Sequence, residues 1–403
     1  MKRISKSIFV FLLFSIKGFS QFNNNWVFGE SQLAGDTSKY AVMKMDFAAS
    51  NPVISKFPLM EFILDLAIAT ISDSTGNLVL YTNGIQIKNN QHEVVENGDS
   101  LPNSNSWLQI FPQNQGVLIL PRPGYNKQYL LFTADIFGFT TPQLGFDSGA
   151  SNLTYSVIDM TKNNGKGKVV ERKKIMVADT LTGGQITAVK HGNGRDWWVL
   201  TSRYNTNQYY VFLITPDGFE NYGLQVINSP MRVSLGQAVF APNGEWYLRY
   251  NTVAHPYSAW FDIYKFDRCI GLLGNHQHIQ LANEVQPGGV AVSANSRFAY
   301  VAVWDTIYQF DLQSPNVETS KKIVAVYDGF MDNIGEEFGV TILEPTRFFN
   351  MELGPDNKIY ISVPNTNSHY LHVIEKPDSM GISCTVLQHK IRLPTVHTYG
   401  IPN

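Results

Sequence analysis

Residues 184–203 read GQITAVKHGNGRDWWVLTSR, and this stretch decides the fold because it holds every part of a β-hairpin. A short apolar segment is followed by a turn rich in Gly, Asn and Asp, and then by a segment that opens with two tryptophans. Apolar segments of this length on both sides of such a turn predict two antiparallel strands.

The same pattern returns five more times, from residues 67, 116, 236, 289 and 350. These stretches read AIATISDSTGNLVLYTNG, GVLILPRPGYNKQYLLFTAD, GQAVFAPNGEWYLRYN, GVAVSANSRFAYVAVW and NMELGPDNKIYISVPN. Their turns lie about 50 to 70 residues apart, which indicates a repeat architecture. The chain is therefore expected to consist of similar β units.

A third strand and a fourth apolar run follow most hairpins. The third strands number seven and read YAVMKMDF, GIQIKNN, LTYSVIDM, YYVFLITPDG, FDIYKFD, TIYQFDL and YLHVIEKPD. No segment keeps apolar residues at helical spacing for more than about two turns. Four antiparallel strands repeated seven times predict an all-β fold, a seven-bladed β-propeller that fills residues 21–403 as a single domain.

The first unit lacks a first strand, which would leave an open edge beside the core. Residues 397–403, HTYGIPN, form the one leftover segment with strand character. We therefore expect the C-terminal strand to join the N-terminal blade and close the ring. Gly116, Gly184, Gly236 and Gly289 open the innermost strands, where crowding at the axis favours glycine; ordinary loop glycines are the alternative.

The first twenty residues, MKRISKSIFVFLLFSIKGFS, have the order of a signal peptide. Lys2, Arg3 and Lys6 precede a short apolar core, and the small residues Gly18 and Ser20 precede Gln21. Residues 1–20 are therefore predicted to be a signal peptide, and the protein to be exported to the periplasm, cell surface or medium. An exported chain can form disulfides, and pairing of its two cysteines remains open.

Nearly all the long connections fall on one face of the expected propeller, at residues 98–114, 135–152, 251–259 and 329–346. Loops presented by a rigid scaffold often carry function. The predicted ligand-binding residues are aromatic side chains of this face, namely Trp107, Phe111, Phe137, Phe139, Tyr204, Tyr257 and Phe330. Such rings suit a protein or glycan partner, and the alternative is that they fold back over the blade cores.

Patterns that would indicate chemistry are weak. His276 and His278, like His369 and His372, show no third ligand at a metal-like spacing, so surface histidines explain both pairs. The acidic residues at 328, 332, 336 and 337 read as a solvated loop, and sequence cannot fix the separation of Asp135 and Asp147. No catalytic residue, metal site or cofactor is predicted.

The overall charge narrows the class of partner. Lysine and arginine total 31 against 33 aspartates and glutamates, which gives a formal net charge of −2. Nucleic-acid binding needs a basic footprint, so no nucleic-acid partner is expected. After the signal peptide, no apolar run approaches the about 18 residues needed to span a membrane.

Several stretches carry a family resemblance. NNNWVFG, ISDSTGNLVLYTNG, LTYSVIDMTKNNGKG and ITAVKHGNGRDWWV resemble propeller regions of secreted bacterial proteins associated with gliding motility and type IX secretion. APNG and GPDN are similar to turns of TolB-like, YVTN-type and WD40-like propellers. The resemblance implies a cell-envelope or extracellular location and a binding role. Such proteins commonly continue into adhesion repeats or a sorting domain. This sequence ends at Asn403, so the chain is expected to be either a free-standing propeller or a shortened sequence.

These patterns favour an exported, non-catalytic propeller scaffold that binds a protein or glycan partner through the long-loop face. One alternative is a propeller enzyme acting on polysaccharide, as a glycoside hydrolase or lyase. The other is a structural component of a cell-envelope assembly.

Overall fold

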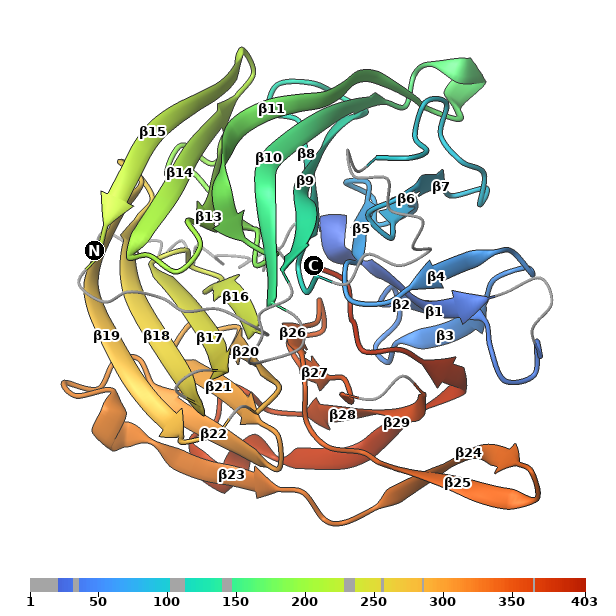
Figure 1. Cartoon of the computed structure of the whole chain (residues 1–403), viewed down its shortest axis with the longest axis vertical. Helices are drawn as coiled ribbons and strands as arrows, with labels where there is room; N and C mark the ends of the chain where they lie inside the picture. The colour runs from blue at the N-terminus through green and yellow to red at the C-terminus, as the bar shows by residue number, and fades with distance from the viewer. Residues whose placement is uncertain are drawn as a thin grey trace, which may run out of the picture.

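The computed structural model is a ring of seven β-sheet blades around a central axis (Figure 1). It describes residues 21–31, 36–101, 113–139, 147–227, 236–254, 257–284, 286–364 and 367–403. Blades follow one another around the ring in chain order, which confirms the predicted seven-bladed β-propeller. Within the described ranges, no helix has both the length and the apolar character to cross a membrane.

The blades are numbered here in chain order. Blade 1 holds β1 (Asn25–Ser31), β2 (Val42–Asp46), β3 (Val53–Lys56) and β4 (Phe62–Leu64), and blade 2 holds β5 (Ala69–Ser72), β6 (Leu78–Thr82) and β7 (Ile87–Asn89). Blade 3 holds β8 (Val117–Pro121), β9 (Gln128–Phe139), β10 (Asp147–Asp159) and β11 (Lys168–Thr182), and blade 4 holds β12 (Thr187–Lys190), β13 (Trp197–Ser202), β14 (Gln208–Thr215) and β15 (Gly218–Val226).

The remaining blades follow the same order. Blade 5 holds β16 (Gly236–Phe240), β17 (Trp246–Ala254), β18 (Tyr257–Asp267) and β19 (Leu272–Ala282), and blade 6 holds β20 (Gly288–Val292), β21 (Phe298–Val303), β22 (Thr306–Asp311) and β23 (Lys322–Val326). Blade 7 holds β26 (Met351–Leu353), β27 (Ile359–Ile361), β28 (Ser368–Ile374) and β29 (Val386–His397), and a separate hairpin, β24 (Met331–Glu337) with β25 (Val340–Pro345), precedes it.

Blade 4 shows how local sequence builds a blade. The His191 N–H donates to the Asp196 carbonyl at 2.9 Å and closes the turn between β12 and β13, where Gly194 has a φ of +74°. His191 is therefore a turn residue. Both faces of β13 are buried because each blade packs between two others. Trp198 is buried toward blade 5, and its indole N–H donates to the Arg268 carbonyl at 2.7 Å.

Blade 2 carries a rudimentary fourth strand. Its third strand, β7, meets residues 93–95 through two backbone hydrogen bonds of 3.0 Å, one from Asn89 N–H to the Glu93 carbonyl and one from Val95 N–H to the Ile87 carbonyl. An isolated antiparallel bridge joins Lys88 to Val94 at the same place. The segment thus occupies the position that the fourth strand takes in other blades.

The C-terminal strand β29 joins the N-terminal blade, as predicted: Val396 forms a parallel bridge with Tyr40, and its N–H donates to the Lys39 carbonyl at 3.0 Å. Residues 397–403 do not, however, supply the innermost strand of that blade. The open edge of β1 is instead paired by β4, with Gly29 opposite Leu64. Residues after β29 run alongside this edge, and the Thr398 hydroxyl donates to the Leu64 carbonyl at 2.5 Å. The chain then ends near the centre of the ring, where the Asn403 N–H donates to the Ile68 carbonyl at 2.9 Å (Figure 1).

Glycines at the axis lie where a side chain would not fit. A Cβ at Gly184 would overlap the Asn114 carbonyl oxygen, and one at Gly236 would overlap the Tyr250 carbonyl oxygen. Gly289 lies against the side chain of Gln237 in the same way. These close approaches confirm the predicted axial role for the three glycines.

Three of the four long connections contain extended hairpins. Strands β9 and β10 pair as far as Phe139 with Asp147, and β17 and β18 pair as far as Ala254 with Tyr257. The third is the hairpin β24–β25. Residues predicted as loops at 135–139, 147–152 and 251–259 therefore lie largely in strands, because the blade strands continue beyond the ring.

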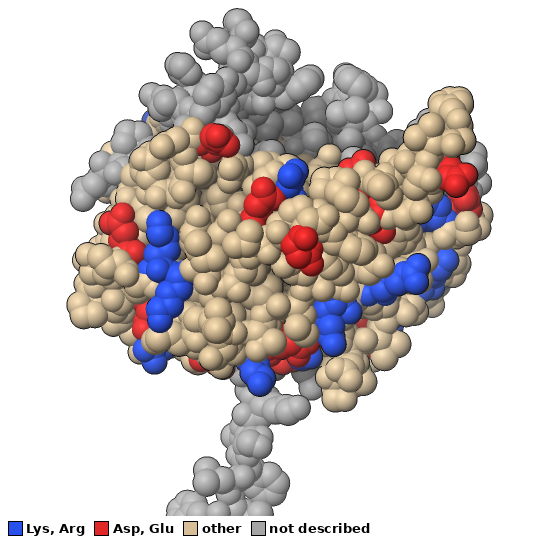
Figure 2. Space-filling view, turned by 90° about the horizontal axis from the view of Figure 1, so that it is seen from below, with Lys and Arg blue, Asp and Glu red and all other residues tan. Residues whose placement is uncertain are grey.

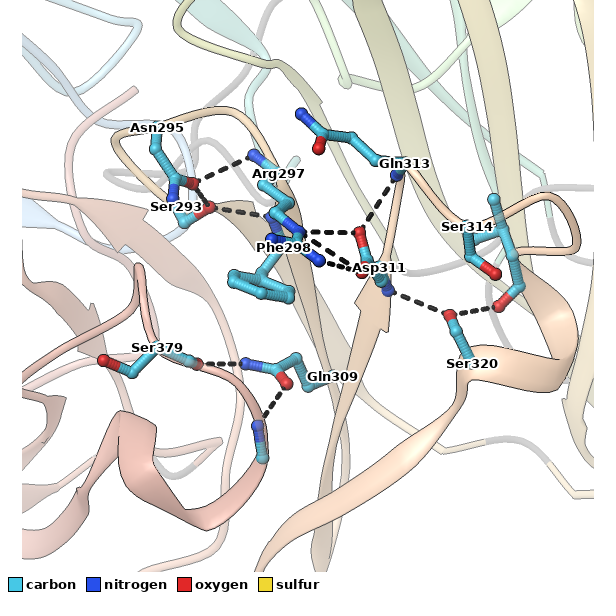
Figure 3. Close-up of polar contacts among 12 residues, drawn as sticks. Ser293, Asn295, Arg297, Phe298, Gln309, Asp311, Gln313, Ser314, Ser320 and Ser379 are labelled. Atoms are coloured by element: carbon cyan, nitrogen blue, oxygen red, sulfur yellow. Dashed lines mark hydrogen bonds and ion pairs between the residues drawn. The ribbon is translucent and has the colours of Figure 1, made fainter.

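Polar contacts fix a short turn within blade 6 and tie this blade to blade 7 (Figure 3). The Arg297 guanidinium donates to both Asp311 oxygens at 2.8–3.2 Å and fixes the end of β22 against the β20–β21 turn. The Gln309 amide donates to the Ser379 carbonyl at 2.8 Å and accepts from the Gly381 N–H at 2.6 Å. One buried amide therefore holds a blade-7 turn in register with blade 6.

Candidate functional site

The structure describes only part of the predicted aromatic ligand face. Trp107 and Phe111 lie outside the described residues. Phe137, Phe139 and Tyr257 lie in β9 and β18, where the backbone path alone is described. The side chains of the remaining two, Tyr204 and Phe330, are both described. The structure therefore leaves the gathering of these seven aromatics as a prediction.

Phe330 packs against blade 7 while keeping a large exposed fraction. Its ring centroid lies 4.3 Å from that of His389 and 5.4 Å from that of Tyr370. The ring nevertheless stays 39% exposed. Tyr204 is half-buried, and its N–H donates to the Thr180 carbonyl at 2.9 Å. Both predicted roles, capping and ligand contact, are compatible with Phe330.

The hairpin β24–β25 presents apolar side chains to solvent. It runs along the outside of the ring beside blade 7, and its tip stands clear of the blades (Figure 1). Alternation along β24 buries Asp332 and Ile334, whereas Met331 is exposed. Phe338 at the tip is 98% exposed and Val340 is 66% exposed. Leu343 is also exposed on β25. Apolar exposure concentrated on one projecting element is typical of an interaction site.

The base of this hairpin is anchored by an acid–histidine contact. Asp332 Oδ2 accepts the His369 backbone N–H at 2.6 Å and lies 3.1 Å from His369 Nδ1. Burial opposes ionisation of Asp332, yet the bonds from His369 hold its pKa below the usual value. The prediction of a solvated acidic loop is therefore wrong for Asp332. The prediction of surface histidines is wrong for His372, which is buried in blade 7 and has its pKa lowered by burial to about 3.

Side-chain amides fill the axis at the start of the innermost strands. The Asn114 amide donates to the Gly236 carbonyl at 2.6 Å and exchanges hydrogen bonds of 2.8–3.0 Å with Asn350. The Gln237 amide donates to the Met351 carbonyl at 2.7 Å, and its oxygen accepts the Val290 N–H at 3.0 Å. Amides suit this place because each one supplies both donors and acceptors to backbones that converge without pairing.

Two carboxylates with raised pKa values lie where the ring closes. Burial, together with the negative charge of Glu30, raises the pKa of Asp65 to about 6. Burial also raises the pKa of Glu30, which Lys39 partly offsets. Asp65 Oδ1 is buried and has no hydrogen-bond partner among the described residues. Mutual repulsion and desolvation of this kind produce a carboxyl group that can hold a proton near neutral pH.

We expect Asp65→Asn to stabilise the protein at alkaline pH. A raised pKa in the folded state favours folding below about pH 4, and this contribution is lost as the pH rises through about 6. At pH 8 the variant should therefore be more stable by about 1–2 kcal/mol, with the difference vanishing near pH 4. Urea unfolding at pH 4, 6 and 8 measures this difference. An unchanged difference across that range would contradict the assignment.

A further carboxyl group lies on the innermost strand of blade 7. Burial raises the pKa of Glu352, on β26, to about 8. Neither Glu30, Asp65 nor Glu352 stands out in the sequence, because isolated acidic residues near strand ends are common. The signal that marks them is desolvation, which depends on the folded ring.

The pair His276 and His278 has a third partner that the sequence analysis did not find. Asp262, on β18, lies within hydrogen-bond distance of both imidazoles. The description of these histidines as surface residues is wrong for His276, whose side chain is 5% exposed.

The structure also places the other residues that the sequence left open. Asp135 is buried in β9, and Asp147 is the first residue of β10. The two cysteines are free thiols, of which Cys269 is exposed and Cys384 is buried.

Comparison with known proteins supports the fold alone. No protein-family profile matches the sequence, and a search of curated protein sequences finds no match. A candidate 6-phosphogluconolactonase from Bacteroides uniformis is similar in structure, with 11% identity, a TM-score of 0.54 and coverage of 94% of this chain and 99% of that chain. A protein from Lactobacillus plantarum follows with 12% identity, a TM-score of 0.47 and the same coverage. The periplasmic gluconolactonase PpgL of Pseudomonas aeruginosa has 10% identity, a TM-score of 0.45 and again that coverage.

Proposed function

We propose that the protein is an exported, non-catalytic propeller scaffold that binds a protein partner through the hairpin β24–β25. The observation that carries this proposal is the exposure of Phe338, Val340 and Leu343 on an element that leaves the ring. A β-hairpin with exposed apolar side chains can offer both pockets and an unpaired strand edge to another chain. Phe330 at its base extends the same surface toward blade 7.

Charge and sequence features support this assignment. In the view of Figure 2, basic and acidic side chains are scattered over the surface and form no broad patch of one sign. Such a surface suits a protein partner better than a polyanion. The predicted signal peptide at residues 1–20 and the resemblance to gliding-motility-associated propellers support a location in the cell envelope or outside the cell.

Replacing Phe338 and Val340 together by serine is expected to weaken partner binding by at least about tenfold, because apolar anchors dominate such interfaces. The measurement is capture from envelope extracts of the native host, followed by titration of the purified partner. Val226→Ser is the matched control, since Val226 is also strongly exposed but lies on β15 of blade 4. Equal binding by the serine pair and the wild type would contradict the proposal, whereas co-purification at fixed stoichiometry with several envelope proteins would favour a structural role.

A glycan partner would give a different result with the same set of variants. Glycan-array binding that is lost on Trp107→Ala or Phe111→Ala, and kept in the hairpin variant, would assign the long-loop aromatics to sugar stacking. That outcome would replace the protein partner with a glycan and leave the non-catalytic scaffold intact.

The pair Glu30 and Asp65 favours a second candidate, an enzyme acting on polysaccharide. A carboxyl group with a pKa near 6 beside an ionisable neighbour can serve as a general acid. Release of sugar that is abolished by Asp65→Asn or Glu30→Gln, with unchanged unfolding at pH 4, would establish this alternative. Undiminished binding without sugar release would exclude it for the polysaccharides assayed.

A further inference from the structure

We propose that Asp262, His276 and His278 form a binding site for a divalent transition-metal ion such as Zn²⁺ on blade 5. The three ligand atoms all lie within 4.8 Å of one another. Two imidazole nitrogens and one carboxylate oxygen are the donors that zinc and related ions prefer. This site is separate from the hairpin β24–β25 and independent of the function proposed above.

Strand register brings the three residues together. Asp262 lies on β18 directly opposite His278 on β19. His276 is two residues before His278, so both imidazoles lie on the same face of the sheet as the carboxylate. His276 Nε2 lies 2.7 Å and His278 Nδ1 lies 2.6 Å from Asp262 Oδ1. Both rings therefore converge on a single oxygen atom.

Aromatic stacking fixes the orientation of the two imidazoles. The His276 ring is parallel to Tyr264 to within 3°, with centroids 4.4 Å apart. The His278 ring is parallel to Trp260 to within 11°, with centroids 4.0 Å apart. Each histidine stacks on the residue two positions from Asp262 in β18, so the same strand supplies the carboxylate and both ring supports. Ligands held in this way lose little conformational entropy on binding a metal.

A second residue orients the carboxylate. The Asn251 amide on β17 donates to Asp262 Oδ2 at 3.1 Å and leaves Oδ1 for the histidines. Hydrogen bonds of this type to a ligating carboxylate are the usual outer support of protein metal sites. Asp262 is 1% exposed, whereas His278 is 30% exposed, so the site is rigid on its inner side and open on its outer side.

The contacts around Asp262 Oδ1 have hydrogen-bond lengths, and metal coordination would change them slightly. An ion about 2.0–2.2 Å from each donor requires donor separations of about 3 Å or more, so each nitrogen would move away from Oδ1 by a few tenths of an ångström. His278 can make this movement because it lies at the exposed edge. Three protein ligands leave a coordination position for water or for an anionic group of a ligand.

Titration of the purified protein, prepared without a polyhistidine tag and dialysed against a chelator, tests the site. Calorimetry with Zn²⁺ and absorption spectroscopy with Co²⁺ at pH 7.5 should show one ion bound per chain. The stacked indole of Trp260 offers a second readout, because Cu²⁺ at the site should quench its fluorescence. His278→Ala is expected to weaken binding on the order of 100-fold, because losing a ligand exceeds the effect of losing an outer partner.

The matched control is His191→Ala, which removes a histidine from a turn of the adjacent blade 4 and should leave binding unchanged. His278→Ala should retain the wild-type circular dichroism, because the residue lies at the exposed edge, and His276→Ala then repeats the test from the inner side. Binding of equal strength in the wild type and in His278→Ala would overturn the proposal. Absence of Zn²⁺ and Co²⁺ binding to the wild type would do the same and would leave the cluster as a hydrogen-bonded acid–histidine group.

Discussion

Gly184→Ala should lower the free energy of unfolding by about 4 kcal/mol or prevent folding, because it combines two penalties. Gly184 has a φ of +82°, a conformation in which an L side chain is strained. Its Cβ would also overlap the carbonyl oxygen of Asn114, which is backbone and cannot rotate away. That carbonyl accepts the Gln185 N–H at 3.0 Å, so the overlap separates blade 3 from blade 4 at the axis.

Gly194→Ala is the matched control for this substitution. Gly194 has a similar φ of +74°, but a Cβ there would meet nothing within 4 Å. The control should lose only the conformational part, roughly 1–2 kcal/mol. Urea unfolding midpoints of both variants measure the difference. Similar losses would mean that the backbone at Gly184 relaxes freely and that axial crowding does not select glycine.

The repeated hairpins could be predicted from the sequence because their determinants are local. In 191–196, glycine and asparagine at fixed places close the turn, and of the two tryptophans that follow, Trp198 is buried and Trp197 is half-buried against the neighbouring blade. Each unit repeats this pattern of turn and buried strand, so a misassigned strand in one unit does not change the predicted number of blades. Seven similar sheets then have few ways to bury both faces, and closure into a ring satisfies all of them.

The closure itself could not be predicted in detail. Strand β4 has only three residues, Phe62–Leu64, and no turn motif marks its beginning. Its pairing with β1 depends on a backbone path that returns across blade 1. The C-terminal residues also have strand-like composition, but residues 398–403 bond to Leu64 and Ile68. The side chain of Asn403 accepts from the Gln115 amide and donates to two backbone carbonyls at the innermost strands. Composition alone cannot distinguish a β-strand from a C-terminal segment that packs in the centre of the ring.

The candidate metal site could not be predicted from the sequence for a related reason. Asp262 precedes His276 by 14 residues, across the end of β18, a turn and the start of β19, so no metal-like sequence spacing joins them. Only the register of β18 with β19 places Asp262 opposite His278. The alternation of His276 and His278 indicated a shared face, but the nature of that face depends on which residues the neighbouring strand presents. Chemistry assembled across strands is therefore visible only once the register is known.

Arg249→Met is expected to lower the free energy of unfolding by about 3–5 kcal/mol, because it removes a buried charge from a connected polar network. Arg249, on β17, is fully buried and lies opposite Asp262 in the strand ladder. Its guanidinium bonds across the interface to three blade-4 residues: Gln185, Ser202 at 3.0 Å and Tyr209 at 3.3 Å. Methionine fills a similar volume, but it leaves these three groups without that donor and Asp262 without the nearby positive charge.

Arg195→Met is the appropriate comparison, because the Arg195 guanidinium is also hydrogen-bonded, in this case to Asp196, but its side chain is 58% exposed. An exposed ion pair contributes about 0–1 kcal/mol, so this variant should unfold close to the wild type. Arg249→Lys separates charge from geometry: a lysine keeps the charge but cannot reach three acceptors with one planar group, so an intermediate loss is expected. If Arg249→Met and Arg195→Met unfold at the same urea concentration, the network does not join blades 4 and 5. The remaining contacts, such as the packing of Tyr209 against Tyr247 with ring centroids 5.8 Å apart, would then hold the two blades together.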